Sequence, residues 1–160
     1  MMELVIVIVL VSVAALVFSK MFIEAVRSYE WVDVEKEKLQ EARYAQERMT
    51  REFRRVRNNV SITAATATTF TFVDRDAATV SFSWSGVKGA DLVYTKNGTA
   101  RVLASGVDSL GFAYWKTNGT AAVPVLSPSA TDIWRVTAYL RLAKAGHTVE
   151  TMSGAFVRSL

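Results

Sequence analysis

The sequence predicts an α+β fold in which one long N-terminal helix packs on an antiparallel sheet. An apolar run opens the chain, a stretch without Gly or Pro continues it to about Asn58, and short alternating segments fill the remainder. We therefore expect residues 1–23 to form an apolar helix segment and residues 24–58 its amphipathic continuation. Residues 59–160 are expected to form an antiparallel β domain.

Composition narrows the classes of function. The chain has 160 residues, a formal net charge of +4, no cysteine and a single histidine, His147. The lack of cysteine excludes disulfides, thiol chemistry and iron–sulfur sites. One histidine is too few for a His-based metal cluster within one chain. We expect no metal, no cofactor and no enzymatic activity, and the charge is too small to imply nucleic acid by itself.

The apolar run covers residues 4–18, where Ser12 is the one polar side chain. A helix of this length measures about 22 Å, short of the ~20 residues that cross a bilayer, but further apolar residues extend it past Glu3 and Lys20. No basic segment precedes it, which disfavours a secretory signal peptide and leaves a plain membrane anchor open. Lys20 and Arg27 follow the run, so the positive-inside rule alone places the larger part in the cytoplasm.

The continuation carries one apolar stripe at alternating spacings of three and four residues. Its members are Leu39, Ala42, Gln46, Met49, Phe53, Val56 and Val60, with Gln46 as the polar exception. We expect Leu39, Met49, Phe53 and Val56 to pack the helix against the sheet. The opposite face is charged and is interpreted as solvated.

Four arginines lie near the predicted end of this helix: Arg51, Arg54, Arg55 and Arg57. Cations at a helix C-terminus interact favourably with the macrodipole, which is the simpler interpretation. The alternative is a patch that binds DNA or another anionic polymer. The motif RNN at Arg57–Asn59 predicts the end of the helix.

Alternating segments predict six or seven strands, with one apolar sheet face that the helix stripe covers. The predicted strand segments are 68–74, 78–84, 91–105 as a hairpin across Asn97–Gly98, 108–121 with a turn at Asn118–Gly119, 132–144, and a last segment after Gly146. We interpret Trp84, Trp115 and Trp134 as core or sheet-face residues in preference to a ligand platform.

The order of these features resembles the type IV pilin and pseudopilin family over the whole chain. MMELVIVIVL is similar to the family's mature N-terminus, usually Phe-Thr-Leu-Ile-Glu before an aliphatic run, with Glu3 at the motif glutamate. The segments RMTREFRRVRN, ATTFTFVDRDAATVSFSW, LASGVDSLGFAYW and IWRVTAYLRLAKAGHTVE are similar to minor pilins and to J-type pseudopilins.

The resemblance implies a structural subunit of a type IV pilus-like filament in a bacterium. Such a subunit is stored in the inner membrane through residues 1–23, processed by a prepilin peptidase, and assembled by dedicated machinery into a helical homo-oligomer outside that membrane. Glu3 would pair with the N-terminal amine of a neighbouring subunit during assembly. The alternative for Glu3 is that its side chain reaches the lipid head groups.

Two other functions stay open. One is a minor pseudopilin of a type II secretion system. The other is a membrane-anchored module that binds DNA or a surface ligand through its sheet or its arginines.

The sequence departs from the family in lacking a leader peptide with its glycine, a C-terminal disulfide and a proline in the first helix. The missing leader predicts that the sequence starts at an internal methionine of a longer precursor, or that processing differs. Because that leader is typically basic and cytoplasmic, it would supply the charges that the orientation rule counts.

Overall fold

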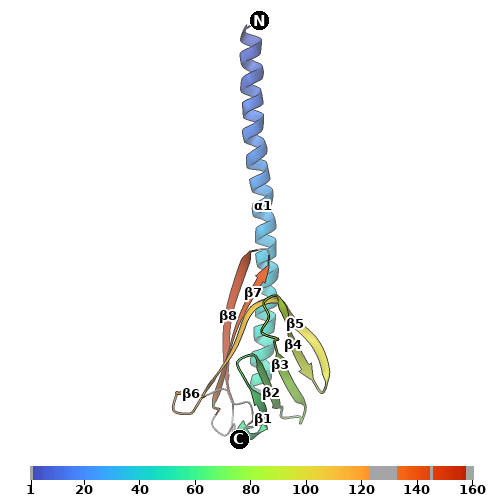
Figure 1. Cartoon of the computed structure of the whole chain (residues 1–160), viewed down its shortest axis with the longest axis vertical. Helices are drawn as coiled ribbons and strands as arrows, with labels where there is room; N and C mark the ends of the chain where they lie inside the picture. Colours follow the sequence, from blue (N-terminus) through green and yellow to red (C-terminus); the bar gives the residue numbers. More distant parts are fainter. Residues whose placement is uncertain (1, 123–132, 145, 158–160) are drawn as a thin grey trace. The chain divides into compact units, whose positions relative to one another are not determined.

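The computed structural model describes residues 2–122, 133–144 and 146–157 (Figure 1). A long helix, α1 (Met2–Phe53), is followed by the 3-10 helix η1 (Asn59–Ser61). The strands are β1 (Ile62–Ala65), β2 (Thr69–Val73), β3 (Thr79–Ser83), β4 (Ala90–Lys96), β5 (Thr99–Trp115), β6 (Ala121–Ala122), β7 (Arg135–Lys144) and β8 (His147–Phe156). The chain divides into two compact units, Met1–Glu37 and Lys38–Leu160, and α1 contributes to both.

The strands form one antiparallel sheet in the order β1-β2-β3-β4-β5-β7-β8, with β6 pairing with β5. One long helix and an antiparallel sheet confirm the predicted α+β class. The β4–β5 hairpin turns at Asn97 and Gly98, whose φ angles of 49° and 80° suit the mirror-image turns that close tight hairpins. The strand β1 was not expected from the sequence.

The strand β5 explains why the sheet curls. The sequence predicts a break between 91–105 and 108–121, but Thr99–Trp115 is one strand whose first part pairs with β4 and whose second part pairs with β7. Gly106 marks the change with a φ of 66°, and a Cβ atom there would lie 2.9 Å from the Ala143 carbonyl oxygen. The Phe112 N–H then donates to the Ala67 carbonyl at 2.8 Å, so the curl brings β5 to the β1–β2 turn.

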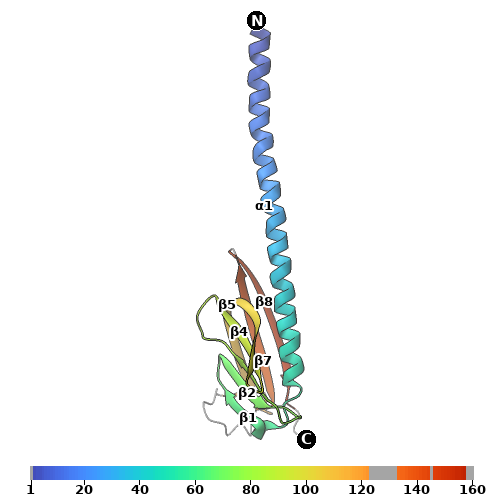
Figure 2. The same cartoon turned by 90° about the vertical axis from the view of Figure 1, so that its right-hand side faces the viewer.

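The core lies between the sheet and the Lys38–Phe53 part of α1, which runs along one sheet face (Figure 2). Phe53 stands at its centre, with edge-on ring contacts to Phe70, Phe82 and Phe112 at centroid distances of 5.2, 5.5 and 6.2 Å. Alternation along β7 buries four residues that lie on one face of the strand: Val136, Ala138, Leu140 and Leu142.

The helix ends at Phe53, before the end predicted near Asn58. The residues that follow find partners at the end of β2, because Val56 bridges Asp74 and the Arg57 N–H donates to the Val73 carbonyl at 3.3 Å. Asn58 is instead the N-cap of η1 and accepts from the Ser61 N–H at 2.8 Å. The stripe consequently loses its last member, since Val60 is 74% exposed.

Candidate functional site on the helix

The Met1–Glu37 unit presents an apolar surface with no cover. Large apolar side chains between Met2 and Val32 are 43–83% exposed, and α1 is long and apolar enough to cross a membrane. Exposed apolar surface on this scale marks a contact with lipid or protein. The described residues 2–23 of the sequence-predicted segment lie within this surface, which continues to Val26 and Val32.

Few polar groups interrupt the apolar surface. The Ser12 and Ser19 hydroxyls donate to the carbonyls of Ile8 and Ala15 at 2.8 and 2.9 Å, so both are satisfied within the helix. Glu3 lies in the first turn and is exposed, and the described residues offer its carboxylate no ion-pair partner. In an apolar environment such a carboxylate needs a partner, because burying it unpaired is costly.

Two exposed aromatic residues follow the apolar surface. Tyr29 is 77% exposed and Trp31 is 58% exposed, just beyond Arg27. Tyrosine and tryptophan are enriched where a membrane-spanning segment meets the head groups. The sequence interpretation missed this pair, although its position after Lys20 and Arg27 was a readable signal.

The stripe residues of α1 lie against the sheet. Met49, Phe53 and Val56 are at most 1% exposed, while Leu39 is partly buried against the same core. The Lys38–Leu160 unit therefore buries these stripe residues in its own core.

Gln46, the polar exception in the stripe, joins the helix to β7 and β8. Its Nε2 donates to the carbonyl oxygens of Thr151 at 3.0 Å and Ala138 at 3.4 Å. Its Oε1 accepts from the Ser153 hydroxyl. These bonds satisfy a side chain that is only 7% exposed, as burial of an amide requires.

A second polar cluster, Lys38–Glu41–Ser105, joins the helix to β5. The Lys38 ammonium lies 2.6 Å from Glu41 Oε2 and donates to the Ser105 carbonyl at 3.1 Å. The Ser105 N–H and hydroxyl donate to Glu41 Oε1 at 2.6 and 2.9 Å. Burial alone would raise the pKa of Glu41, but Lys38 and the bonds from Ser105 outweigh it and hold that pKa below its usual value.

The four arginines do not form one surface. Arg55 makes ion pairs with Asp74 at 3.6 Å and with Asp76, whereas Arg57 is exposed. Arg51 and Arg54 line an open hollow of about 560 Å³ together with Glu47. An anion-binding patch here would rest on Arg51 and Arg54, because Arg55 already pairs with carboxylates.

Asp74 is a buried carboxylate that the sequence interpretation did not single out as a structural centre. It accepts from the N–H groups of Asp76 and Ala78, each at 2.9 Å, and pairs with the Lys96 ammonium at 3.0 Å. Burial alone would raise its pKa, but Lys96 and the backbone donors hold the pKa below its usual value. The group organises the β2–β3 turn beside the helix end.

No group of three or more metal-ligating side chains occurs among residues 2–122, 133–144 and 146–157. Comparison with known protein families and with curated proteins finds no match for this chain.

Proposed function

We propose that this chain is a structural subunit of a type IV pilus-like filament, stored in a bacterial inner membrane and assembled through its N-terminal helix. The observation that carries the proposal is the uncovered apolar surface of residues 2–32 in a chain whose Lys38–Leu160 unit has a core of its own. That surface has no role in folding the sheet, so its role lies in contacts with other molecules.

One surface can serve both storage and assembly. Lipid tails and the side chains of packed helices are both apolar, so a helix passes from one environment to the other without exposing its side chains to water. Tyr29 and Trp31 would lie at the head groups in the stored state, which puts the preceding apolar residues inside the bilayer.

Continuity of α1 favours a filament over a loosely tethered module. The helix is unbroken from Met2 to Phe53, and no Gly- or Pro-rich linker separates the apolar surface from the residues that pack on the sheet. Flexible tethers are usually rich in such residues. The residues that join the apolar surface to the sheet-packing stripe therefore lack the composition of a flexible tether.

Glu3 provides the sharpest test of this proposal. If it pairs with the terminal amine of a neighbouring subunit, Glu3→Gln should abolish most filament formation, because an unpaired buried charge costs several kcal/mol. Glu3→Asp should be intermediate, since the charge remains and its reach shortens. The measurement is the yield of subunit in sheared filaments relative to subunit in the membrane.

Glu24→Gln is the matched control, because Glu24 is an exposed carboxylate on the same helix. It should assemble like the parent chain. Equal filament yields for the parent, Glu3→Gln and Glu3→Asp would refute pairing and leave Glu3 at the membrane boundary. Subunit found only as membrane monomer in every strain would favour an anchored binding module, and filaments confined to the periplasm would favour a secretion pseudopilus.

A further inference from the structure

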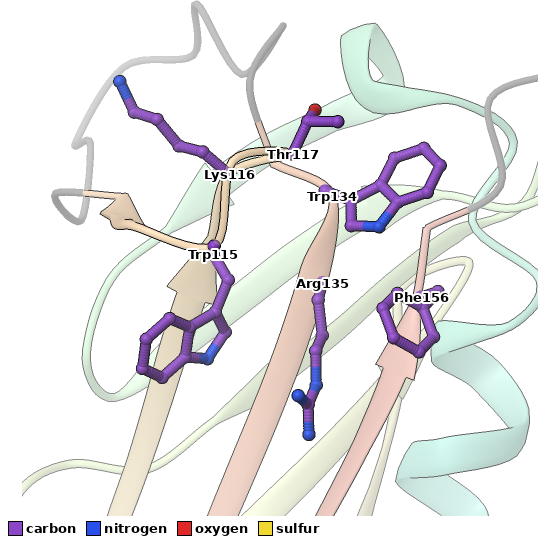
Figure 3. Close-up of a pocket in the computed structure, with 7 residues that line it drawn as sticks. Trp115, Lys116, Thr117, Trp134, Arg135 and Phe156 are labelled. Atoms are coloured by element: carbon purple, nitrogen blue, oxygen red, sulfur yellow. The ribbon is translucent and has the colours of Figure 1, made fainter.

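A cavity of about 340 Å³ lies at the end of the sheet where β5, β7 and β8 meet (Figure 3). Trp115 closes β5, Arg135 begins β7 directly after Trp134, and Phe156 closes β8. The β5–β6 turn completes the lining with Lys116, Thr117 and Gly119. Neither the filament proposal nor the sequence interpretation gives these residues a role beyond a sheet face.

Strand register places three of them in one row. Trp115 pairs with Arg135, and Arg135 pairs with Phe156, so their side chains leave the same face of the sheet. That face is the one turned away from the core, because the next residue of β7, Val136, is fully buried. The row alternates aromatic, cationic and aromatic side chains across three strands.

The neighbouring row on this face consists of the small residues Ala113, Thr137 and Gly154. Thr137 holds Trp115 in position. The Trp115 Nε1–H donates to the Thr137 hydroxyl at 3.1 Å, and that hydroxyl donates to the Ala113 carbonyl at 3.2 Å. On β8, Gly154 pairs with Thr137. Because Gly154 has no side chain, the Thr137 and Arg135 side chains can lie close to its Cα. A Cβ atom on Gly154 would lie 2.9 Å from Thr137 Cγ2 and 3.4 Å from Arg135 Nε.

Among the described residues, Arg135 contacts the Phe156 ring and no carboxylate. Its Cζ lies 5.6 Å from the centre of the Phe156 ring, and the Phe156 ring contacts Trp134 edge-on at 6.3 Å. No ion pair to Arg135 is present in the described part of the chain. Figure 3 shows Arg135 between Trp115 and Phe156, while Lys116 extends away from the row. Both aromatic residues remain partly accessible, since Trp134 is 37% and Phe156 57% exposed.

This lining selects a flat ligand that carries negative charge. Its described side chains include cations and rings but no carboxylate or amide, so beyond the Thr117 hydroxyl they offer few acceptors to the hydroxyls of a neutral sugar. A second copy of this chain fits poorly as the partner. The exposed charged side chains of its α1 helix mix both signs, as in Glu35, Lys36, Glu47 and Arg51, and among the described residues they offer no anionic strip.

We propose that this cavity binds one nucleotide unit of a single-stranded nucleic acid. The base stacks on the Trp134 ring. The Arg135 guanidinium donates a charge-assisted hydrogen bond to the adjacent phosphate, and Lys116 lies at the rim of the cavity. The cavity volume is at the lower end for ligand sites and suits a single unit. The chain's net charge of +4 supports approach of a polyanion. The site is independent of whether the chain forms filaments.

The test is fluorescence anisotropy of a labelled 12-nucleotide oligothymidine titrated with the full chain in a non-ionic detergent. Trp134→Ala should raise the dissociation constant roughly 5- to 150-fold, the range for loss of one stacked base. Arg135→Ala should weaken binding and lower the slope of log affinity against log salt by about 1. Trp134→Phe and Arg135→Lys keep a ring and a charge and should be intermediate.

Matched controls separate the site from general charge. Arg101→Ala removes an exposed arginine at the β4–β5 hairpin, and Tyr44→Ala removes an exposed ring on α1. Both should bind the oligonucleotide like the parent. Near-ultraviolet circular dichroism checks that each variant keeps its fold, and Trp134→Phe decides the case if Trp134→Ala does not fold.

Several results would overturn the proposal. One is no binding of oligothymidine by the parent, and another is equal affinity for an abasic strand or a duplex, since neither presents bases to stack. If only Arg54→Ala weakens binding of the oligonucleotide, the binding site lies at the end of α1 instead. Tighter binding of polygalacturonate, weakened by the same two variants, would identify an acidic polysaccharide site instead.

Discussion

The two parts of α1 share a backbone conformation and differ in almost everything else. From Met2 to Val32 the large apolar side chains surround the helix and are exposed. From Lys38 to Phe53 the apolar residues narrow to a stripe, and the buried polar side chains Lys38, Gln46 and Glu52 all bond to other groups. The apolar side chains of the first part can be covered only by other molecules, whereas those of the second part are covered by the sheet of the same chain.

The largest effect expected from this contrast is at Phe53. Phe53→Ala should lower the free energy of unfolding of the Lys38–Leu160 unit by about 3–5 kcal/mol, because the ring is fully buried and three aromatic neighbours lose a contact. Leu10→Ala, the counterpart in the exposed part, should leave that free energy unchanged. Urea unfolding of the full chain in detergent, followed by near-ultraviolet circular dichroism, measures both. A loss below about 1 kcal/mol at Phe53 would contradict a self-contained core.

A smaller effect is expected at Asp74, and it depends on pH. The folded pKa of Asp74 is lowered, so its ionised form contributes stability above the unfolded value near 3.8, and that stability is lost as pH falls through the folded pKa. Asp74→Asn should cost about 1.5–3 kcal/mol at neutral pH, the usual value of a hydrogen bond to a charged group. Its stability should then fall less than that of the parent below pH 4. Parallel acid-limb profiles for the two chains would show that Asp74 does not contribute.

Gln46 tests whether the second part of α1 depends on polar contacts. Gln46→Met keeps the length of the side chain and removes its bonds to β7 and β8, which should cost about 1 kcal/mol. The same urea experiment applies, with Gln40→Met as the control because Gln40 is exposed on the same helix. A stabilised Gln46→Met chain would mean that packing matters more than these bonds.

The smallest effect is expected at Val60. Because its side chain is 74% exposed, Val60→Ser should change the free energy of unfolding by less than about 0.5 kcal/mol. A loss above about 1 kcal/mol would return Val60 to the buried stripe that its sequence spacing predicts.

Short sequence patterns predicted the features that depend on interactions between residues close together in the chain. The spacing of three and four residues identified Met49 and Phe53 as neighbours on one helix face, and Asn97–Gly98 identified a hairpin because both positions need positive φ. The end of α1 was not predictable in the same way. Residues 54–58 have helix-forming character, and a backbone pairing between Val56 and Asp74 decides their conformation.

The cavity was missed for a related reason. Trp115, Arg135 and Phe156 are far apart along the chain and come together only through the register of three strands. Gly154 matters there because a side chain at this position would meet Thr137 and Arg135. No spacing in the sequence reveals that contact.

The Lys38–Glu41–Ser105 cluster also has a mechanical consequence. It lies in the first turn of α1 that belongs to the Lys38–Leu160 unit, so tension applied from the N-terminal end reaches these bonds before it reaches Phe53. Lys38 and Glu41 each bond to Ser105, so the load is shared among several bonds. Under a pulling force, the cluster would resist separation of this part of α1 from the sheet.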